Sequence, residues 1–269
     1  MRSSVRSIRN LVVCAGVCGA TSVGFAQAGG TINDGNVQLT VGAAPTSGTS
    51  TSIPAVSFSV DGGTTNQVLE NFWWFRLSTD NREFVFNSAV DGASSSFSGN
   101  IGQMQQFYDQ FRADITWEVE STGANAGFFT SRVTITNTSN DTISINLFNY
   151  TDADIGGTPD DDTAILRSTN LISISDALLR ADYSGSNATN FQVASSPSLR
   201  GELTDASEDN FDNTGLPFAA GNFTGGYQWS NVVIDPGFSR SAIITFSIPS
   251  PGSLALAGVG LLALSRRRR

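Results

Sequence analysis

Apolar and polar residues alternate along most of the chain between Gly29 and Pro249, with little 3.6-residue periodicity. In the segment 114–119, Ile115, Trp117 and Val119 alternate with polar residues, so one face is apolar and the other is solvated. Clusters of Gly, Asn, Asp, Ser and Thr separate such segments, as is typical of turns between strands. We therefore predict strands at 37–41, 55–60, 68–77, 83–87, 114–119, 129–137, 143–147, 171–175, 191–194, 226–234 and 239–248.

Two local predictions follow from the middle of the chain. The alternating segments 129–137 and 143–147 flank the polar residues 138–141, which predicts a hairpin. The segment 101–111 is the one stretch that we predict as a short helix.

The predicted fold class is all-β, an antiparallel β-sandwich of immunoglobulin-like or jelly-roll type. A closed barrel is the alternative. The span 29–247 fits one exported domain, since no proline-rich linker or internal repeat divides it. The run Phe72-Trp73-Trp74-Phe75 favours a buried strand over an exposed platform for sugar rings.

The N-terminal residues have the pattern of a secretory signal peptide. Arg2, Arg6 and Arg9 precede an apolar stretch at 11–25, and Ala26-Gln27-Ala28 fits a small-x-small cleavage site. We predict a signal peptide over residues 1–28, cleaved after Ala28.

The C-terminal residues combine a Pro-x-Pro motif, a short apolar run and a block of arginines. Pro249, Ser250, Pro251 and Gly252 precede the run 254–264, and Arg266, Arg267, Arg268 and Arg269 end the chain. A helix over 252–265 would span roughly 21 Å, short of the ~30 Å hydrocarbon core of a bilayer. The guanidinium groups would stop translocation, so we predict a temporary anchor; an ordinary transmembrane anchor is the alternative.

This tail resembles the PEP-CTERM sorting signal of bacterial surface proteins, with Ser250 in place of the glutamate of the family motif. The resemblance covers residues 248–269 and implies export by the Sec machinery, transient anchoring in the membrane through the C-terminal helix, and processing by an exosortase-type enzyme. It also implies a final location at the cell surface or outside the cell, where extracellular polysaccharide is a candidate partner.

The amino-acid composition of the part predicted to be exported excludes several kinds of catalytic and metal-binding site. Once both ends are set aside, eight arginines face 24 acidic residues, a net charge of −16 that disfavours nucleic acid as a partner. The chain has no lysine and no histidine, and Cys14 and Cys18 lie in the signal peptide. This excludes Ser-His-Asp and Cys-His catalysis, lysine Schiff bases and thiolate or imidazole zinc sites within the domain. Carboxylates remain, either for glycoside hydrolysis or as ligands for calcium.

The densest group of carboxylates lies at 152–162. Asp152, Asp154, Asp160, Asp161 and Asp162 surround a Gly-Gly-x-Pro turn, and carboxylates this close repel one another unless a cation compensates them. We name these five residues as candidate calcium ligands, although their spacing differs from that of an EF-hand. A solvated acidic turn is the alternative.

Carboxylates suitable for hydrolysis are also present. Glu118 and Glu120 share a strand face with Cα atoms ~6.6 Å apart, and Glu70, Glu83, Glu202 and Glu208 lie elsewhere. Because alternation creates such pairs on any half-exposed strand, we assign no catalytic residue and no certain cofactor. The sequence favours a non-enzymatic surface or matrix protein of structural, adhesive or glycan-binding type. The alternative is a secreted carbohydrate-active enzyme that uses only Asp and Glu, which would need two acidic side chains in a cleft.

Overall fold

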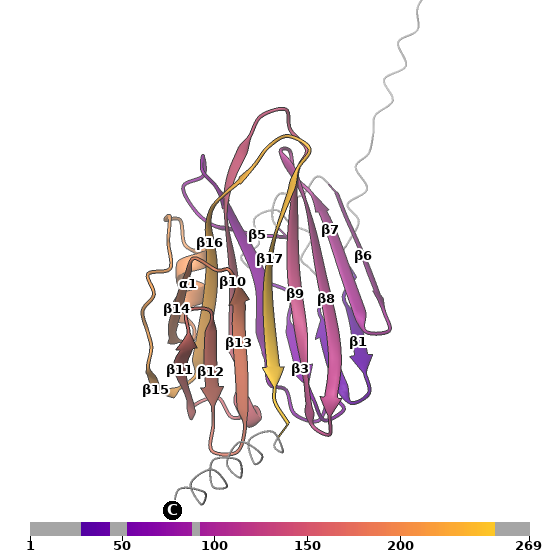
Figure 1. The fold of residues 1–269 in the computed structure, drawn as a ribbon, viewed down its shortest axis with the longest axis vertical. Coiled ribbons are helices and arrows are strands. Elements are labelled where there is room, and N and C mark those ends of the chain that lie inside the picture. Colours follow the sequence, from indigo (N-terminus) through magenta and orange to yellow (C-terminus); the bar gives the residue numbers. More distant parts are fainter. Residues whose placement is uncertain (1–27, 44–52, 88–91, 251–269) are drawn as a thin grey trace, which may run out of the picture.

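The computed structural model describes residues 28–43, 53–87 and 92–250. Within these residues the protein is mostly β, and its strands form three open-edged antiparallel sheets (Figure 1). The smallest sheet has the order β1-β2-β3, with β1 (Gly30–Asp34), β2 (Val37–Val41) and β3 (Val56–Ser59).

The two larger sheets contain the remaining strands. The five-stranded sheet has the order β14-β16-β10-β4-β5, with β14 (Asn190–Ser195), β16 (Phe223–Ile234), β10 (Ile143–Ala153), β4 (Glu70–Leu77) and β5 (Phe84–Val85). The nine-stranded sheet has the order β15-β11-β12-β13-β17-β9-β8-β7-β6, with β15 (Phe218–Gly221), β11 (Asp162–Ser168), β12 (Leu171–Ser175), β13 (Arg180–Ser186), β17 (Ser239–Ile248), β9 (Ala126–Asn137), β8 (Phe111–Gly123), β7 (Ile101–Phe107) and β6 (Gly92–Ser98).

The five-stranded and nine-stranded sheets pack face to face through an aromatic core. The Trp73 indole N–H donates to Ser131 Oγ at 2.8 Å, and the Tyr183 hydroxyl donates to Asn149 Oδ1 at 2.7 Å. Each bond joins the two sheets, since Trp73 and Asn149 belong to the five-stranded sheet and their partners belong to the nine-stranded sheet. The polar ends of these buried rings are therefore paired, as burial of Trp and Tyr requires.

Whether a strand alternates apolar and polar residues or is buried throughout depends on whether one or both faces of its sheet are covered by other parts of the protein. In β8, buried and more exposed residues alternate from Phe111 to Glu120, because one face packs inward and the other meets solvent. In β4, all six residues from Asn71 to Arg76 are buried. A continuous buried run of this kind requires cover on both faces of the sheet.

The cover on the second face of the five-stranded sheet comes from α1 (Ser198–Thr204) and the segment 205–217. Leu199 and Leu203 of α1 are buried, and so is Phe211. The Phe211 ring lies against Gly226, where a Cβ atom would be 2.6 Å from the ring. Glycine at this position therefore allows the covering segment to lie directly on β16.

The segment predicted as a helix at 101–111 is instead strand β7, a turn and the start of β8, so that prediction is wrong. Gly102, Met104 and Gln106 are buried and alternate with more exposed residues, which is the two-residue period of a strand. Four of the seven residues of β7 are polar or glycine, so its apolar signal was too weak to show this period.

The hairpin predicted between 129–137 and 143–147 is also wrong. β9 pairs with β8 and β17 in the nine-stranded sheet, whereas β10 pairs with β4 and β16 in the five-stranded sheet. The loop 138–142 crosses between the layers. The Asn137 side chain spans this crossing, because its amide donates to the carbonyls of Asp141 and Ile234, both at 2.8 Å.

The prediction of an antiparallel all-β protein is confirmed for the described residues, where no sheet closes into a barrel. The aromatic run 72–75 is buried, as predicted. No helix in the described residues is long and apolar enough to cross a membrane. Ala26, Pro251, Gly252 and Arg266 to Arg269 lie outside the described residues, whereas Ala28 is exposed and Pro249 and Ser250 follow β17.

Replacing Trp73 with alanine tests the interlayer core. The substitution removes a fully buried ring and leaves Ser131 without its partner, so we expect the free energy of unfolding to fall by about 3–5 kcal/mol. Leu178→Ala is the control, because Leu178 is 89% exposed and its loss should change stability by less than about 0.5 kcal/mol. Urea denaturation measures both, and equal losses in the two variants would contradict this packing.

Candidate functional site

The outer face of the five-stranded sheet carries polar groups at both ends and aromatic rings between them. Strand register places Arg76 beside Asn146 at one end and Glu70 beside Asp152 at the other. Trp74 pairs with Phe148 between them, and the Trp74 ring meets Tyr150 edge-on. Alternation along β4 and β10 brings these residues to one face.

A polar cleft of about 470 Å³ opens at the Arg76 end. This volume lies within the range of small-molecule sites. Side-chain amides and charged groups dominate its lining, which consists of Arg76, Leu77, Ser78, Asp80, Asn146, Asn190, Glu208, Asn210, Phe211, Gln228, Ser230 and Asn231.

Arg76 lies in the buried wall of the cleft and holds several of its lining residues through ion pairs and hydrogen bonds. Its guanidinium is 3% exposed and forms ion pairs with the buried Glu83 and, at 2.9 Å, with Glu208. It also donates to the Asp209 carbonyl and to Asn210 Oδ1 at 2.8 Å, and it lies 5.6 Å from the centre of the Phe148 ring. One cation therefore fixes the segment 208–210 against β4 through directional bonds.

Two carboxylates of the cleft occupy different environments. Burial raises the pKa of Asp80, although the Leu77 N–H donates to this carboxylate and the Arg76 charge opposes the rise. Glu208 is more exposed, at 55%, and its carboxylate is paired with Arg76. The two carboxylates of one cleft therefore differ both in burial and in their hydrogen-bond and ion-pair partners.

An apolar hollow of about 210 Å³ adjoins the cleft. Leu77 and Asp80 line both spaces. The lining of the hollow is mainly aromatic and includes Phe75, Phe84, Tyr108 and Phe111.

The opposite end of the face holds a second acidic group. Glu70 forms an ion pair with Arg200 of α1, and Ser196 donates to Asp152 Oδ2 at 3.1 Å. Burial is the largest cause that raises the pKa of Asp152 to about 6, and the charges of Asp154 and Glu70 add to the shift. Burial likewise raises the pKa of Asp162 to about 7.

The five candidate calcium ligands separate into two sets. Asp152, Asp154 and Asp162 are buried, whereas Asp160 and Asp161 are exposed. In the part of the chain that the structure describes, no three acidic, histidine or cysteine side chains are arranged to hold a metal ion.

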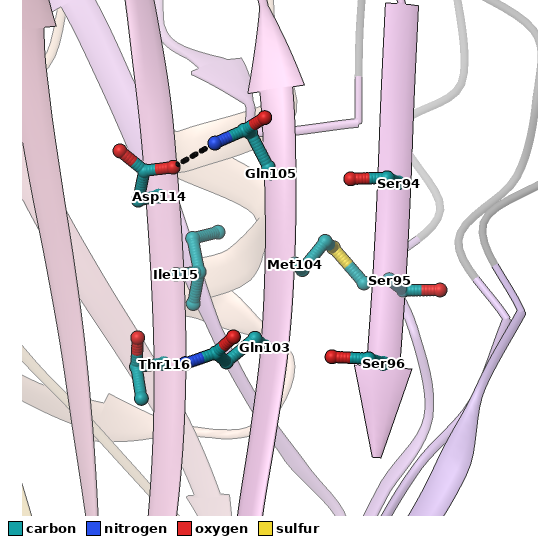
Figure 2. A pocket seen from close by; sticks show the side chains of 9 residues that line it. All are labelled: Ser94, Ser95, Ser96, Gln103, Met104, Gln105, Asp114, Ile115 and Thr116. Atoms are coloured by element: carbon teal, nitrogen blue, oxygen red, sulfur yellow. Dashed lines mark hydrogen bonds between the residues drawn. The ribbon is translucent and has the colours of Figure 1, made fainter.

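The pair Glu118 and Glu120 lies on the exposed outer face of β8, with no covering segment. A hollow of about 340 Å³ lies nearby on the outer face of β6, β7 and β8 (Figure 2). Its rim carries the hydroxyls of Ser94 and Ser96 and the amide of Gln105, which donates to Asp114 at 2.6 Å.

Sequence patterns did not indicate Asp80 as a site residue, placed Arg76 with the aromatic run 72–75 in the core, and marked Glu208 only as one of several separate carboxylates. The signal for Arg76 was a charged residue that directly follows the aromatic run 72–75, which is costly in a buried strand unless the charge is paired. The signal for Glu208 was weaker, because only the folded chain brings the segment 208–211 onto β4 and β16.

No protein-family model matches the chain, and no curated protein matches it. Among solved structures, a bacterial glucoamylase complexed with acarbose matches 89% of this chain with a TM-score of 0.53 and 12% identity. A protein from the human microbiome, provisionally assigned as a kojibiose phosphorylase, matches 80% of the chain with a TM-score of 0.41 and 11% identity. The chain corresponds to 34% of the first protein and 26% of the second, so it spans about a third or less of their length.

The likeness to the glucoamylase corrects the prediction of a non-enzymatic structural, adhesive or glycan-binding protein, because this arrangement of sheets also occurs in an enzyme. At 12% identity the likeness concerns the fold alone.

Arg76→Ala tests the organisation of the cleft. The substitution leaves Glu83, which is 1% exposed, without its cation, and we expect unfolding free energy to fall by about 3–5 kcal/mol. Arg112→Ala is the matched control, because it breaks the half-exposed Arg112–Asp114 pair and should cost at most about 1 kcal/mol. Denaturant titration of both variants measures the difference. A loss of 1 kcal/mol or less in Arg76→Ala would contradict the central role of this guanidinium.

Proposed function

We propose that the chain is a carbohydrate-active enzyme, or the part of one, that acts on a glycosidic bond with carboxylates alone. The observation that carries this proposal is the polar cleft of about 470 Å³ with Asp80 and Glu208 in its lining. Amide side chains suit the many hydroxyl groups of a sugar, because each amide both donates and accepts. The adjoining aromatic hollow suits the apolar face of a sugar ring.

Asp80 is the proposed general acid. Its raised pKa keeps more of the carboxyl protonated, as protonation of a leaving-group oxygen requires. Glu208 is the proposed base or nucleophile, because its exposed carboxylate lines the cleft and is held in place by the Arg76 guanidinium at 2.9 Å. As the bond between the glycosidic oxygen and the anomeric carbon breaks, the proton of Asp80 would pass to that oxygen, and Glu208 would either attack the anomeric carbon or accept a proton from the water molecule that attacks it. If Glu208 attacks, a water molecule would then displace it and give a proton back to Asp80.

The fold supports this proposal. The likeness to part of a glucoamylase complexed with acarbose, a likeness of fold, makes a sugar a reasonable ligand class to test first. We further infer that the facing sheets form a single β-sandwich, because Trp73–Ser131 and Tyr183–Asn149 bonds join them. No histidine, lysine or cysteine is needed for carboxylate chemistry, which agrees with the composition of the chain.

Export remains part of the proposal. We infer that residues 1–28 direct secretion and that residues 248–269 act as a sorting tail, with processing that leaves the enzyme at the cell surface or outside the cell. Extracellular polysaccharide would then be its substrate class. Fractionation of cells that produce the full chain tests this part separately, and full-length protein recovered from the cytosol would contradict it.

Substitution of the two carboxylates tests the proposed chemistry. A panel of oligosaccharides is incubated with the full chain, and release of reducing ends is measured. Asp80→Asn and Glu208→Gln should each lower kcat by about 10²-fold or more, because each removes a group that acts in the transition state. Glu120→Gln is the control, since Glu120 lies on the open face of β8 and its loss should leave kcat unchanged. Equal activity in all three variants would exclude the cleft as the reaction site.

The pH profile tests the role of Asp80 as an acid. A raised pKa in the folded protein means that the protonated form persists below that pKa and is lost as pH rises through it. The profile of kcat/KM should therefore fall on its alkaline side with a pKa above the ordinary aspartate value of 3.8. A profile that is flat from about pH 4 to 8 would show that no such acid takes part.

A further inference from the structure

We infer that Asp154, Asp162 and Asn222 form a binding site for a hard divalent cation, for which calcium is the best chemical match. Each residue presents a buried side-chain oxygen, Oδ1, that has no hydrogen-bond partner. The site lies at the edge where β10, β11 and β16 meet, away from the polar cleft. It is independent of the proposed reaction.

Strand pairing brings the three residues to one place. Asp162 at the start of β11 pairs with Gly221 at the end of β15, and Ala153 at the end of β10 pairs with Phe223 at the start of β16. Asn222 lies between Gly221 and Phe223, so the register sets it between the chain segments that carry Asp154 and Asp162. The turn η1 (Ile155–Gly157) closes the loop from Asp154 towards Asp162.

Burial of these oxygens without hydrogen-bond partners destabilises the folded protein. Asp162 is fully buried and Asp154 is 7% exposed, yet one oxygen of each has no partner among the described residues. Among the described residues, the second oxygen of Asp162 accepts a hydrogen bond from the Ile155 N–H alone, at 3.4 Å. A carboxylate removed from water without compensation carries a large penalty, which either a proton or a bound cation relieves.

The surrounding charges favour a cation. The charge of Asp160 acts on Asp154, and the charges of Asp154, Asp161 and Asp176 act on Asp162, so both buried carboxylates lie in a field of like charges. Arg200, the arginine of this end of the sheet, is paired with Glu70. A divalent ion would balance the two buried charges of Asp154 and Asp162 and would reduce the repulsion from the exposed aspartates.

The donor set suits calcium. Calcium accepts six to eight oxygens from carboxylates, amide carbonyls, backbone carbonyls and water, with flexible geometry. Two aspartates and an asparagine supply three such oxygens, and a set of this kind contains only two acidic side chains. It therefore agrees with the absence, among the described residues, of any group of three acidic, histidine or cysteine side chains arranged around a metal.

The inferred site revises the five ligands that the sequence indicated. Asp160 and Asp161 are exposed and contribute charge only. Asp152 accepts a hydrogen bond from Ser196 at Oδ2, while its buried Oδ1 is unpaired among the described residues. The third inferred ligand, Asn222, lies 60 residues after Asp162 in the sequence.

Calcium binding to the full chain provides the test. The purified protein is stripped with a chelator and titrated with Ca²⁺ up to about 10 mM, above the range of about 10⁻⁴–10⁻³ M at which extracellular calcium modules bind. We expect one ion per chain by equilibrium dialysis and a rise in Tm, because the ion binds the folded state. Asp162→Asn and Asn222→Ala should both lose the bound ion and the rise in Tm.

Asp160→Asn is the matched control, since it removes one negative charge from the same loop without removing an inferred ligand. It should bind one ion with a rise in Tm close to that of the wild type. If Asp162→Asn does not fold, Asn222→Ala still decides the matter, because it changes no charge. Absence of binding by the wild type would overturn the inference, and so would equal loss of binding in Asp160→Asn and Asn222→Ala.

Discussion

The five-stranded sheet is covered on both faces, and this double burial is the constraint on which the rest of the structure depends. Its inner face meets the nine-stranded sheet through Trp73 and Asn149, and its outer face lies under α1 and the segment 205–217. Double cover explains why β4 is buried without interruption from Asn71 to Arg76. It also means that every polar group on this sheet must find a partner inside the protein.

The protein meets that requirement differently at the two ends of the outer face. At one end, Arg76 compensates Glu83 and Glu208 and leaves a cleft lined with amides. Beyond the other end, where β10 leads into the loop before β11 of the nine-stranded sheet, Asp154 and Asp162 have no arginine partner among the described residues, and one oxygen of each is unpaired there. A chain without lysine or histidine has few cations to distribute, so the eight arginines between residues 29 and 247 determine which carboxylates are paired. We infer that the paired end performs chemistry and that the unpaired end recruits an ion.

Sequence patterns predicted the β class because alternation is a local property of each strand. The segments 171–175 and 239–248 match β12 and β17 in full. Partner choice is not local, which is why the segments 129–137 and 143–147 resembled a hairpin although they belong to different sheets. The strand at 101–107 was missed because glutamine and glycine dilute its apolar positions.

The candidate site likewise depends on contacts between distant segments, which local sequence patterns do not reveal. The dense aspartates at 152–162 were visible in the sequence, but their division into buried and exposed members depends on where β11 begins. The cleft joins residues from β4, β10, β14, β16 and the segment 208–211, which no spacing along the chain brings together. Arg76 was the one local clue, as a charge next to a buried aromatic run.

A crystal structure of the full chain with a bound oligosaccharide tests the central claim most directly. The account predicts a sugar ring in the cleft, with the Asp80 carboxylate at the glycosidic oxygen, the Glu208 carboxylate at the anomeric carbon, and the ring's apolar face towards the aromatic hollow at Phe84. A sugar found on the outer face of β6, β7 and β8 with the cleft empty would contradict it (Figure 2).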